Sequence, residues 1–463
     1  MAFWRPFDYT NLSSLAADII DQKLNLPISE DVSVLAEPIR LYGRNIKNRI
    51  AILPMENFDS RDDGSPSELT IRRYRRFSKG GAGIIWTEST FTSMDSRSSL
   101  RMMGITEKNK DVFSHMITEM KEEAADGIPP FVICQLSHCG RLSNLDRHGV
   151  PVPAYIACEN PYLPRANTSI LSDEQIFGII DDYVKAAALC KEAGFDAVDI
   201  RACHGYLLSE MLSAYTRENS IFGGSFENRT RMLLTIIDRI NTEVGIPVAC
   251  RLNGTDLIPY PYGFGMKTDG SMEADLSEPI KLGQILVSKG VQLLNISLGR
   301  GHADHMLSPS DHPRYYPKAH QLTAINFFQG MAAQFKEAIP EAVIMTGGFS
   351  WLKMYGPEVA AGGILAGKYD LAGFGKTALA NPDFANEIVH DGKLKQDGWC
   401  LNCGMCGRLI GRGGTTGCVV RDKEMYGPIF KKRSELMKGR PFPPSMEKEY
   451  PLKLFELSTE RQT

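Results

Sequence analysis

Residues 173–201 read DEQIFGIIDDYVKAAALCKEAGFDAVDIR and show the unit from which the chain is built. Apolar residues recur at helical spacing over Asp173–Glu192, and a short apolar run with β-branched residues follows at 197–201. This pattern is typical of an amphipathic helix that leads into a buried strand. The same alternation recurs along most of the chain, with eight predicted strands at 49–54, 83–87, 130–135, 197–201, 247–252, 291–297, 342–346 and 370–375.

Helical patterns separate these strands, as at 108–125, 227–242 and 322–337. Eight strand-and-helix units indicate the α/β class and a (β/α)8 barrel, or TIM barrel, rather than a doubly wound sheet. We expect residues 1–40 to form an N-terminal extension, 41–395 the barrel, and 396–463 a short cysteine-bearing segment and tail. Residues 12–23 have helical spacing and are expected to pack across the barrel floor or to mediate subunit contact.

Polar residues gather at the carboxyl ends of the predicted strands, where the active sites of such barrels lie. They are Glu56, Glu88, Gln135, His138, Arg201, His204, Tyr206, Arg251 and His302. Gly347 and Gly348 follow the seventh strand, and Gly375 with Lys376 follows the eighth. Glycine permits close backbone approach and Lys376 supplies charge, so these two loops match the usual phosphate site of the fold.

Four cysteines follow the predicted barrel: Cys400, Cys403 and Cys406 in the run CLNCGMC, and Cys418. Three thiolates in a tight loop with one distant partner favour the corners of a [4Fe–4S] cluster. Structural zinc, which usually takes two separated C-x2-C pairs, is the alternative, as is a chance grouping. The other six cysteines are dispersed and are expected to be free thiols, which suits a reducing, cytoplasmic location.

Composition excludes several classes of protein. The chain has 463 residues, 43 % hydrophobic, with a net charge of −3, and no basic field that would favour nucleic acid. The run Arg72-Arg73-Tyr74-Arg75-Arg76 is more typical of a solvated helix face than of a binding patch. No apolar run approaches the roughly 20 residues that span a bilayer, and the N-terminus lacks the features of a signal peptide.

The stretch from Ala193 to Arg231, with GFDAVDIRACHGYLLSEMLS and FGGSFENRTR, resembles the Old Yellow Enzyme superfamily of FMN-binding ene-reductases. Further similarity lies at Asn48-Arg49-Ile50 leading to Pro54-Met55, at QLSHCGR from Gln135, and from Gly375-Lys376 to Asp383. Together with the cysteines, the resemblance is to the iron–sulfur branch that contains 2,4-dienoyl-CoA reductase, enoate reductase and trimethylamine dehydrogenase. It covers roughly residues 38–420.

The resemblance implies a role for individual residues. Pro54, Met55, Gln135 and Arg251 are expected to hold the FMN ring, with Glu88 nearby, and Gly347, Gly348, Gly375 and Lys376 the phosphate. Lys376 stands where the family usually has arginine, which keeps the charge but loses the bidentate fork. Tyr206 falls where many members keep the tyrosine that protonates the substrate carbon, and His302 lies near a second proton-relay histidine of dienoyl reductases.

Two positions depart from the family pattern. Members usually hydrogen-bond the substrate carbonyl with a pair of side chains three residues apart, and here Arg201 takes the first place and His204 the second. Arg201 either clamps a carboxylate or an enolate or fills a bulkier pocket. Glu56 stands where covalently flavinylated amine dehydrogenases carry cysteine, which implies noncovalent FMN and makes amine dehydrogenation a weaker alternative.

The expected function is therefore an FMN- and [4Fe–4S]-dependent ene-reductase that acts on a small unsaturated carbonyl compound. About 45 residues follow Cys418, too few for the further flavin and nicotinamide domains of the long members. Electrons are expected from NADH or NADPH directly, or from a separate donor flavoprotein through the cluster. The alternatives are an amine dehydrogenase-like enzyme, an electron-transfer subunit and a zinc-stapled barrel. We expect a homo-oligomer without nucleic-acid or membrane partners.

Overall fold

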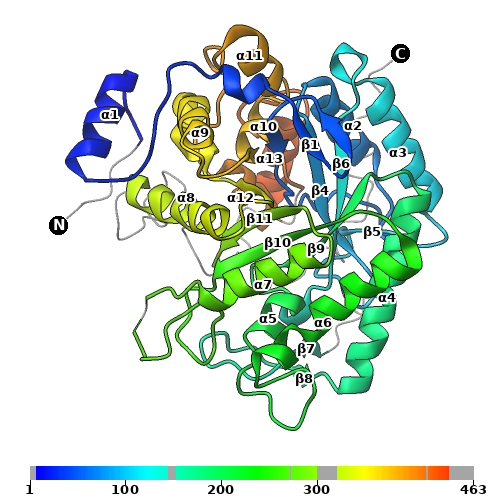
Figure 1. Ribbon diagram of the computed structural model, residues 1–463. Helices are drawn as coiled ribbons and strands as arrows, with labels where there is room; N and C mark the ends of the chain where they lie inside the picture. Colours follow the sequence, from blue (N-terminus) through cyan, green and yellow to red (C-terminus); the bar gives the residue numbers. More distant parts are fainter. Residues whose placement is uncertain (1–6, 144–152, 272, 300–320, 413–414, 437–463) are drawn as a thin grey trace.

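The computed structural model describes residues 7–143, 153–271, 273–299, 321–412 and 415–436. Its central sheet has the strand order β3-β13-β12-β11-β10-β9-β6-β4, and β3 also pairs with β4, so the sheet closes into a parallel barrel (Figure 1). Its strands are β3 (Ile50–Ile52), β4 (Ile84–Phe91), β6 (Phe131–Ser137), β9 (Ala197–Ala202), β10 (Val248–Thr255), β11 (Leu293–Leu298), β12 (Val343–Thr346) and β13 (Leu371–Phe374). The predicted (β/α)8 barrel is confirmed, and each predicted strand overlaps one of these.

Helices surround the barrel and connect its strands (Figure 1). They are α2 (Glu68–Lys79), α3 (Lys110–Glu122), α4 (Asp173–Glu192), α5 (Leu207–Leu212), α6 (Phe226–Arg239), α7 (Ser277–Ser288), α8 (Gln321–Ala338), α9 (Gly356–Leu365), α10 (Lys376–Ala380) and α11 (Phe384–Asp391). Ser172 begins α4 with a capping box, because its side chain accepts from Gln175 N–H while Gln175 caps the Ser172 amide. Such a box satisfies amides that a helix start leaves unpaired.

Side chains from alternate strand positions fill the barrel interior. Trp86, Phe131 and Leu293 belong to one buried apolar cluster inside the ring of strands. The same cluster includes Leu41 and Ile46 from the hairpin of β1 (Ile39–Leu41) and β2 (Arg44–Ile46). This hairpin covers the amino-terminal end of the barrel, where the Tyr42 hydroxyl donates to Val248 O at 2.6 Å.

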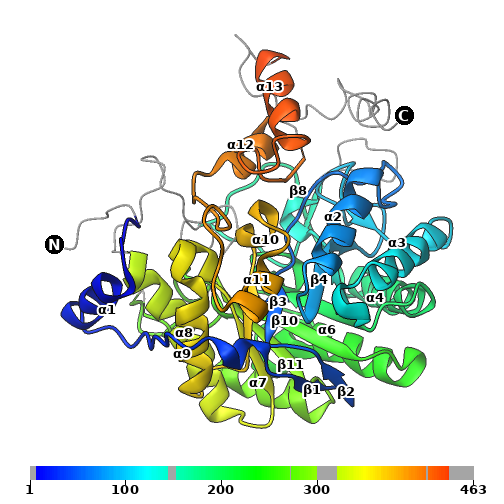
Figure 2. The ribbon, with the colours of Figure 1, turned by 90° about the horizontal axis from the view of Figure 1, so that it is seen from above.

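Helix α1 (Leu12–Asp21) forms where its spacing predicted it, and it lies beside α8 and α9 in both views (Figures 1 and 2). The hairpin, rather than α1, therefore covers the barrel floor. The described residues also hold three short strands: β5 (Met103–Gly104) pairs in parallel with the end of β4, and β7 (Ala154–Ile156) pairs with β8 (Thr168–Ile170). No helix in these ranges is long and apolar enough to cross a membrane.

The C-terminal segment, residues 399–436, carries α12 (Met405–Gly411) and α13 (Tyr426–Leu436) and projects from the barrel (Figure 2). It rests on loops that leave the carboxyl ends of strands. Thr416 N–H donates to Asn57 O at 2.7 Å after β3, and Asn402 Nδ2 donates to Trp351 O at 3.0 Å after β12. The four clustered cysteines thus lie on the same side of the barrel as the expected active site.

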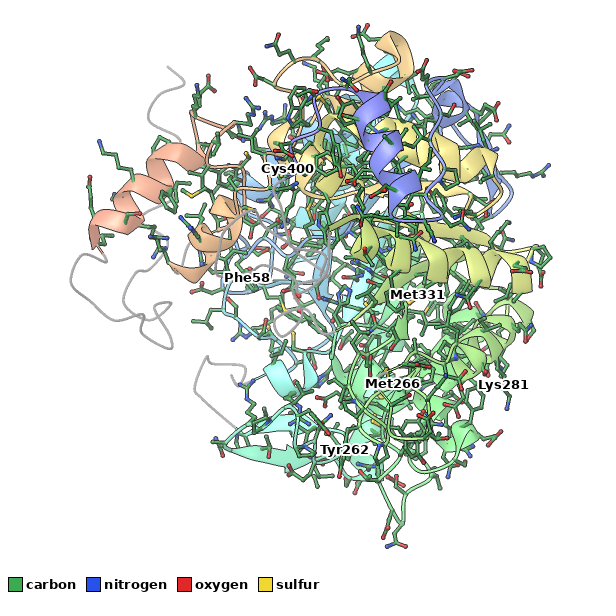
Figure 3. All side chains as sticks on the ribbon, turned by 90° about the vertical axis from the view of Figure 1, so that its left-hand side faces the viewer. Phe58, Tyr262, Met266, Lys281, Met331 and Cys400 are labelled. Atoms are coloured by element: carbon green, nitrogen blue, oxygen red, sulfur yellow. The ribbon has the colours of Figure 1, made fainter. Side chains whose placement is uncertain are left out.

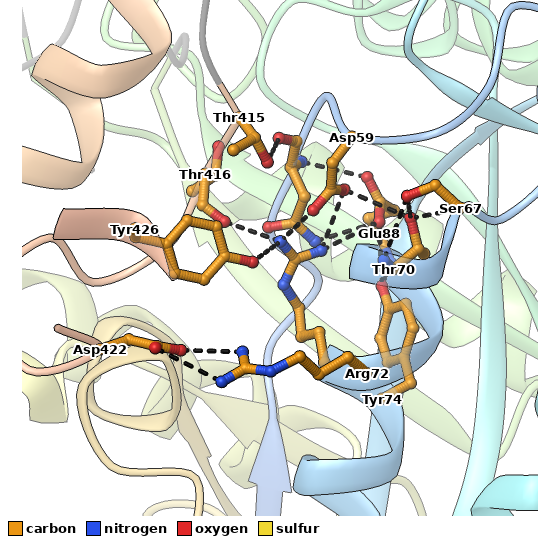
Figure 4. Close-up of polar contacts among 12 residues, drawn as sticks. Asp59, Ser67, Thr70, Arg72, Tyr74, Glu88, Thr415, Thr416, Asp422 and Tyr426 are labelled. Carbon is orange, nitrogen blue, oxygen red and sulfur yellow. Dashed lines mark hydrogen bonds and ion pairs between the residues drawn. The ribbon is translucent and has the colours of Figure 1, made fainter. Parts of the chain in front are cut away.

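Arginines of α2 attach this segment to the barrel (Figure 4). Arg72 and Arg76 both donate to Asp422, at 2.9 and 2.7 Å. The side chain of Arg73 is only 4 % exposed. The expectation of a solvated face is therefore wrong for Arg73, because buried carboxylates and the C-terminal segment surround that position in the fold.

Candidate active site

The register of the barrel places the site residues side by side at the carboxyl ends of the strands. Arg201 on β9 pairs in register with Arg251 on β10. Gln135 on β6 pairs with Asp199 on β9. Because neighbours in a parallel sheet project alike from the same level, residues far apart in sequence meet at one end of the barrel.

A charged cluster of Arg201, Glu56 and Tyr206 lies at this end. Arg201 Nη1 donates to Glu56 Oε1 at 2.8 Å, and the two side chains are 7 % and 17 % exposed. The Tyr206 hydroxyl donates to the same Glu56 oxygen. The Arg201 guanidinium also lies over the Tyr206 ring, with Cζ 3.4 Å from its centroid, a cation–π arrangement. Glu56 thus contacts two of the residues that were expected to act on the substrate.

His204 is fixed in one tautomer by its neighbours. Arg201 Nη2 lies 3.3 Å from His204 Nδ1, and His204 Nε2 lies 2.6 Å from Ser297 Oγ. Arginine can only donate, so Nδ1 accepts and Nε2 carries the proton, an assignment made from the hydrogen-bond network. The backbone of His204 is left-handed, with φ of 63°. This strained turn after β9 aims Arg201, His204 and Tyr206 at one region.

Burial controls the protonation of Tyr206. It raises the pKa of Tyr206 well above its usual value; the Arg201 cation opposes the shift, and the Glu56 carboxylate adds to it. Tyr206 is 3 % exposed and packs with Phe91, Met102 and Cys139. The phenol is therefore protonated at neutral pH and can act as a proton donor.

A second group of polar residues lies around Asp199. The Asp199 carboxylate accepts from Trp86 Nε1 at 3.0 Å and from Gln135 Nε2 at 2.7 Å. It also accepts from the Arg251 backbone N–H at 2.7 Å. Burial raises the pKa of Asp199 to about 6, against these hydrogen bonds. The carboxylate fixes the Gln135 amide and the backbone that carries Arg251.

The Arg251 side chain is a buried cation with weak protein contacts. It is 8 % exposed, and its Nη atoms reach Pro54 O at 3.5 Å and Ser297 Oγ at 3.4 Å. Its Nε has no hydrogen-bond partner among the described residues. Burial lowers the pKa of Arg251. A buried cation of this kind fits a site that receives an acceptor or an anion from a bound molecule.

The glycine loops lie at the ends of β12 and β13. A Cβ on Gly347 would lie 3.1 Å from Leu53 Cδ1, and Gly348 has φ of +94°, so a side chain fits poorly at either position. Met55 lies close to Gly375, since a Cβ there would come within 3.4 Å of its sulfur. The loops expected around the flavin are thus adjacent in space.

Cys400, Cys403, Cys406 and Cys418 line one pocket together with Lys376 and Leu379. Burial raises the pKa of the Cys400 thiol to about 12, and the nearby Lys376 ammonium opposes that shift. Within the described ranges, no group of three or more His, Cys, Asp or Glu side chains has the geometry to hold a metal ion. Figure 3 draws Cys400 and Phe58 on the side of the molecule that carries α12 and α13, with Lys281 on the opposite side.

Three other predicted residues have different placements. Glu88 accepts from Asn57 N–H and Nδ2, both at 3.0 Å, and so supports the loop after β3. His138 is 1 % exposed and its Nδ1 accepts from Gly140 N–H at 3.0 Å; burial lowers its pKa to about 4, so it is neutral. His302 lies outside the described residues.

Sequence reasoning missed how Glu56, Ser297 and Asp199 act together with the expected residues. Glu56 was expected at the rim of the barrel and was interpreted as a sign of noncovalent FMN, but its contacts with Arg201 and Tyr206 were not predicted. Its position directly after the first strand, on the same rim as Arg201, was the available signal. Ser297 ends the sixth predicted strand in the same way. Asp199 lies inside a strand run, and nothing in the local pattern marks its contact with Gln135.

Comparison with known proteins identifies the family. Residues 34–395 match the NADH:flavin oxidoreductase / NADH oxidase family. The chain belongs to this family, which confirms the resemblance to the Old Yellow Enzymes and the flavin-dependent class of oxidoreductases that it implies.

Among relatives, a cinnamate reductase from Clostridium sporogenes is 30 % identical over 431 residues, 89 % of this chain and 61 % of that protein. This chain therefore spans about three fifths of that relative. An NADPH dehydrogenase from Bacillus subtilis is 28 % identical, over 76 % of this chain and 93 % of that one.

Solved structures share the fold. A 2-naphthoyl-CoA reductase complex matches with a TM-score of 0.69 at 22 % identity, over 86 % of this chain and 58 % of the other. Morphinone reductase matches with a TM-score of 0.58 at 21 % identity, and the match covers 78 % of this chain and 90 % of morphinone reductase. At this identity, the likeness shows the fold alone.

Proposed function

We propose that this protein is an NAD(P)H-dependent flavin ene-reductase that reduces a C=C bond conjugated to a carbonyl group. The observation that carries the proposal is the cluster of Arg201, Glu56 and Tyr206 with His204, next to the buried cation Arg251. It combines a protonated phenol with hydrogen-bond donors for a carbonyl oxygen. Family membership and relatives named as reductases support the same reaction class.

The residues present fit FMN at the mouth of the barrel. Arg251 offers an unpaired Nε–H, and the Gln135 amide is held in place by Asp199. The backbone at Pro54 and Met55 would border the ring, and the glycine loops at Gly347–Gly348 and Gly375 would receive the phosphate. Lys376 lines the cysteine pocket, so the glycine backbone carries more of the expected phosphate site than the Lys376 side chain does.

When bound at this site, FMN would supply hydride transfer between NAD(P)H and the β-carbon of the substrate. Arg201 and the Nε2–H of His204 would donate to the carbonyl oxygen and so draw charge from the C=C bond. Tyr206 would give its proton to the α-carbon. The C=C bond becomes a CH–CH unit: the hydride comes from NAD(P)H and the proton is replaced from solvent.

The four cysteines are proposed to hold a [4Fe–4S] cluster. They line one pocket. Cys400, Cys403 and Cys406 stand in one tight loop, and Cys418 follows at a distance in the sequence. A cubane takes its thiolates at four separate iron corners, which suits this arrangement, whereas structural zinc usually takes two separated C-x2-C pairs.

The cluster would connect the flavin site to a further redox partner. The cysteine segment contacts the loops after β3 and β12, close to the proposed flavin site. None of the ten cysteines forms a disulfide bond, in keeping with a reducing compartment such as the cytoplasm. Electrons would arrive from NAD(P)H or through the cluster from a separate flavoprotein.

An anaerobic titration tests the proposal. Protein purified without oxygen is scanned for flavin absorbance, reduced with NADH or NADPH, and then mixed with a panel of enones, enoate esters and enoyl thioesters. The expected result is bleaching by the pyridine nucleotide and recovery of the flavin band with at least one alkene, with the saturated product found by mass spectrometry. Protein that binds FMN and is reduced, but is reoxidised by no member of the panel, would refute the ene-reductase assignment.

A further inference from the structure

We infer that Glu56 is a specificity-determining residue that makes the site select a neutral carbonyl substrate, such as an ester, thioester or ketone, over a free carboxylate. The inference rests on the proposed function and decides between the two roles open to Arg201. It follows from where the Arg201 guanidinium already makes its contacts.

Each end of the Arg201 guanidinium is already in contact with the protein. Nη1 bonds to Glu56 Oε1 at 2.8 Å, Nη2 faces His204 Nδ1 at 3.3 Å, and one face of the group covers the Tyr206 ring. A carboxylate is best bound by two parallel N–H groups of one guanidinium. The Nη1–Nη2 edge is shared between Glu56 and His204, so an incoming carboxylate cannot form a fork on this edge without displacing one of them. Arg201 Nε is buried and has no hydrogen-bond partner among the described residues, so a carboxylate that approaches from that side is opposed by the charge of Glu56 rather than by an occupied edge.

The charges of the site also balance internally. Arg201 is paired with Glu56, and Arg251 lies beside Asp199, whose carboxylate accepts from the Arg251 backbone N–H at 2.7 Å. A substrate carboxylate at Arg201 would come close to the Glu56 carboxylate. The Glu56 side chain is 17 % exposed, so water screens the repulsion only in part. Glu56 therefore opposes an anionic substrate in two ways: it occupies part of the Nη1–Nη2 edge of Arg201, and it places a like charge next to that edge.

A neutral carbonyl meets neither obstacle. Its oxygen needs one or two donors, and it brings no charge toward Glu56. The Nε2–H of His204, now donated to Ser297 Oγ at 2.6 Å, can turn to the substrate while the Arg201–Glu56 pair stays formed. Arg201 can add one hydrogen bond to the same oxygen through its Nε–H, which has no partner among the described residues, without breaking its pair with Glu56.

The test compares two ligands that differ in charge and by one methyl group. Binding of 3-phenylpropanoate and of its methyl ester to the FMN-loaded protein is measured by calorimetry or by perturbation of the flavin spectrum. Neither ligand has a C=C bond in its side chain, so turnover does not interfere. We expect the ester to bind at least about tenfold more tightly than the acid, the effect of one unfavourable charge contact.

Glu56→Gln keeps the shape of the side chain and removes its charge. The ratio of acid to ester affinity should rise at least about tenfold in this variant. Glu68→Gln, at a 70 % exposed side chain on α2, makes the same chemical change away from the site and should leave the ratio unchanged. Adding Arg201→Gln to Glu56→Gln should abolish the gain, because the freed guanidinium is then absent. Glu56→Ala should shift the ratio in the same direction and serves if Glu56→Gln does not fold.

Parent protein that binds the acid as tightly as the ester, or a Glu56→Gln ratio equal to the parent ratio, would overturn the inference. Reoxidation of the reduced protein by methyl cinnamate separates this result from failure of the proposed function. If methyl cinnamate is reduced while the acid 3-phenylpropanoate binds as tightly as its ester, the ene-reductase assignment is supported and the proposed role of Glu56 is wrong. If no alkene is reduced, the ene-reductase falls, and the binding ratios still decide whether Glu56 rejects carboxylates.

Discussion

Tyr206 and Arg201 meet at a single atom of a third residue: the Tyr206 hydroxyl and Arg201 Nη1 both donate to Glu56 Oε1. The phenol proton is therefore directed at a carboxylate in the resting site, and it must turn away from Glu56 to reach a substrate carbon. The Arg201 cation over the ring would stabilise the phenolate left after proton transfer. The proposed acid and the cation that would stabilise its conjugate base are thus in direct contact.

Tyr206→Phe should slow reoxidation of the reduced protein by an alkene by roughly 10²–10⁴-fold, the usual range for a lost general acid. Reduction by NAD(P)H should survive, since it uses no proton from Tyr206. Stopped-flow absorbance at the flavin band measures the two half-reactions separately. Tyr155→Phe, on β7 and outside the cluster, is the matched control. Reoxidation within about threefold of the parent rate would assign the proton to His302 or to solvent.

Glu88 should make the stability of the protein depend on pH. Burial raises the pKa of Glu88 to about 8, and the Asp59 carboxylate adds to the shift. The folded state therefore binds this proton more tightly than the unfolded chain, where the pKa is near 4.5. The contribution of Glu88 is full below about pH 4.5 and is lost as pH rises through about 8.

Glu88→Gln mimics the protonated acid. It should therefore reduce the dependence of the free energy of unfolding on pH between about 4.5 and 8. Chemical denaturation at several values between pH 5 and pH 9 gives the free energy of unfolding. The parent should lose more stability over this range than the variant does. Equal slopes in the two proteins would show that Glu88 is ionised throughout, with Arg73 compensating its charge.

The buried ion pair of Arg73 should be a main attachment of the cysteine segment. Arg73 Nη2 bonds to Asp59 Oδ2 at 2.5 Å, to Thr416 O at 2.7 Å and to Tyr426 OH at 2.9 Å (Figure 4). Arg73→Met leaves Asp59 buried without its partner and should cost about 3–5 kcal/mol. Arg75→Met, on the same helix at a 41 % exposed side chain, should cost at most about 1 kcal/mol.

Limited proteolysis distinguishes local unfolding of the C-terminal segment from global unfolding in the Arg73→Met variant. Cleavage within 415–436 should accelerate before the barrel unfolds, because the lost contacts join that segment to α2. A variant whose barrel and C-terminal segment lose protection together would show that Arg73 supports the whole fold rather than the attachment.

The barrel could be predicted because its signal is local. Each strand is a short apolar run, and each helix shows apolar residues at helical spacing. Ser172 directly precedes Asp173, the first residue of α4, and caps that helix. The register that makes Arg201 a neighbour of Arg251 follows from closure of the sheet. Listing the polar residues after each strand was therefore enough to name most of the residues that the structure brings together at this end of the barrel.

The contacts between these residues could not be predicted in the same way. Glu56 and Tyr206 are 150 positions apart, and no spacing rule links them. Arg73 looked like part of a solvated basic face because helical phase places it among charged neighbours. Its burial depends on a segment more than three hundred residues later, with Thr416 at a separation of 343. Side-chain pairing across a barrel is a property of the closed fold and not of any local pattern.

Cys406→Ala should remove the proposed cluster. Protein prepared anaerobically should contain about four irons and four acid-labile sulfides per chain, and the variant should lose most of both. Because cluster binding is coupled to local folding, the segment at 400–418 should become sensitive to protease even where FMN is retained. Cys158→Ser, at a partly buried cysteine outside the pocket, is the matched control and should keep the full iron and sulfide content. One zinc per chain without sulfide would replace the cluster with a structural zinc site, while parent protein with neither metal nor sulfide would leave the four thiols without a prosthetic group.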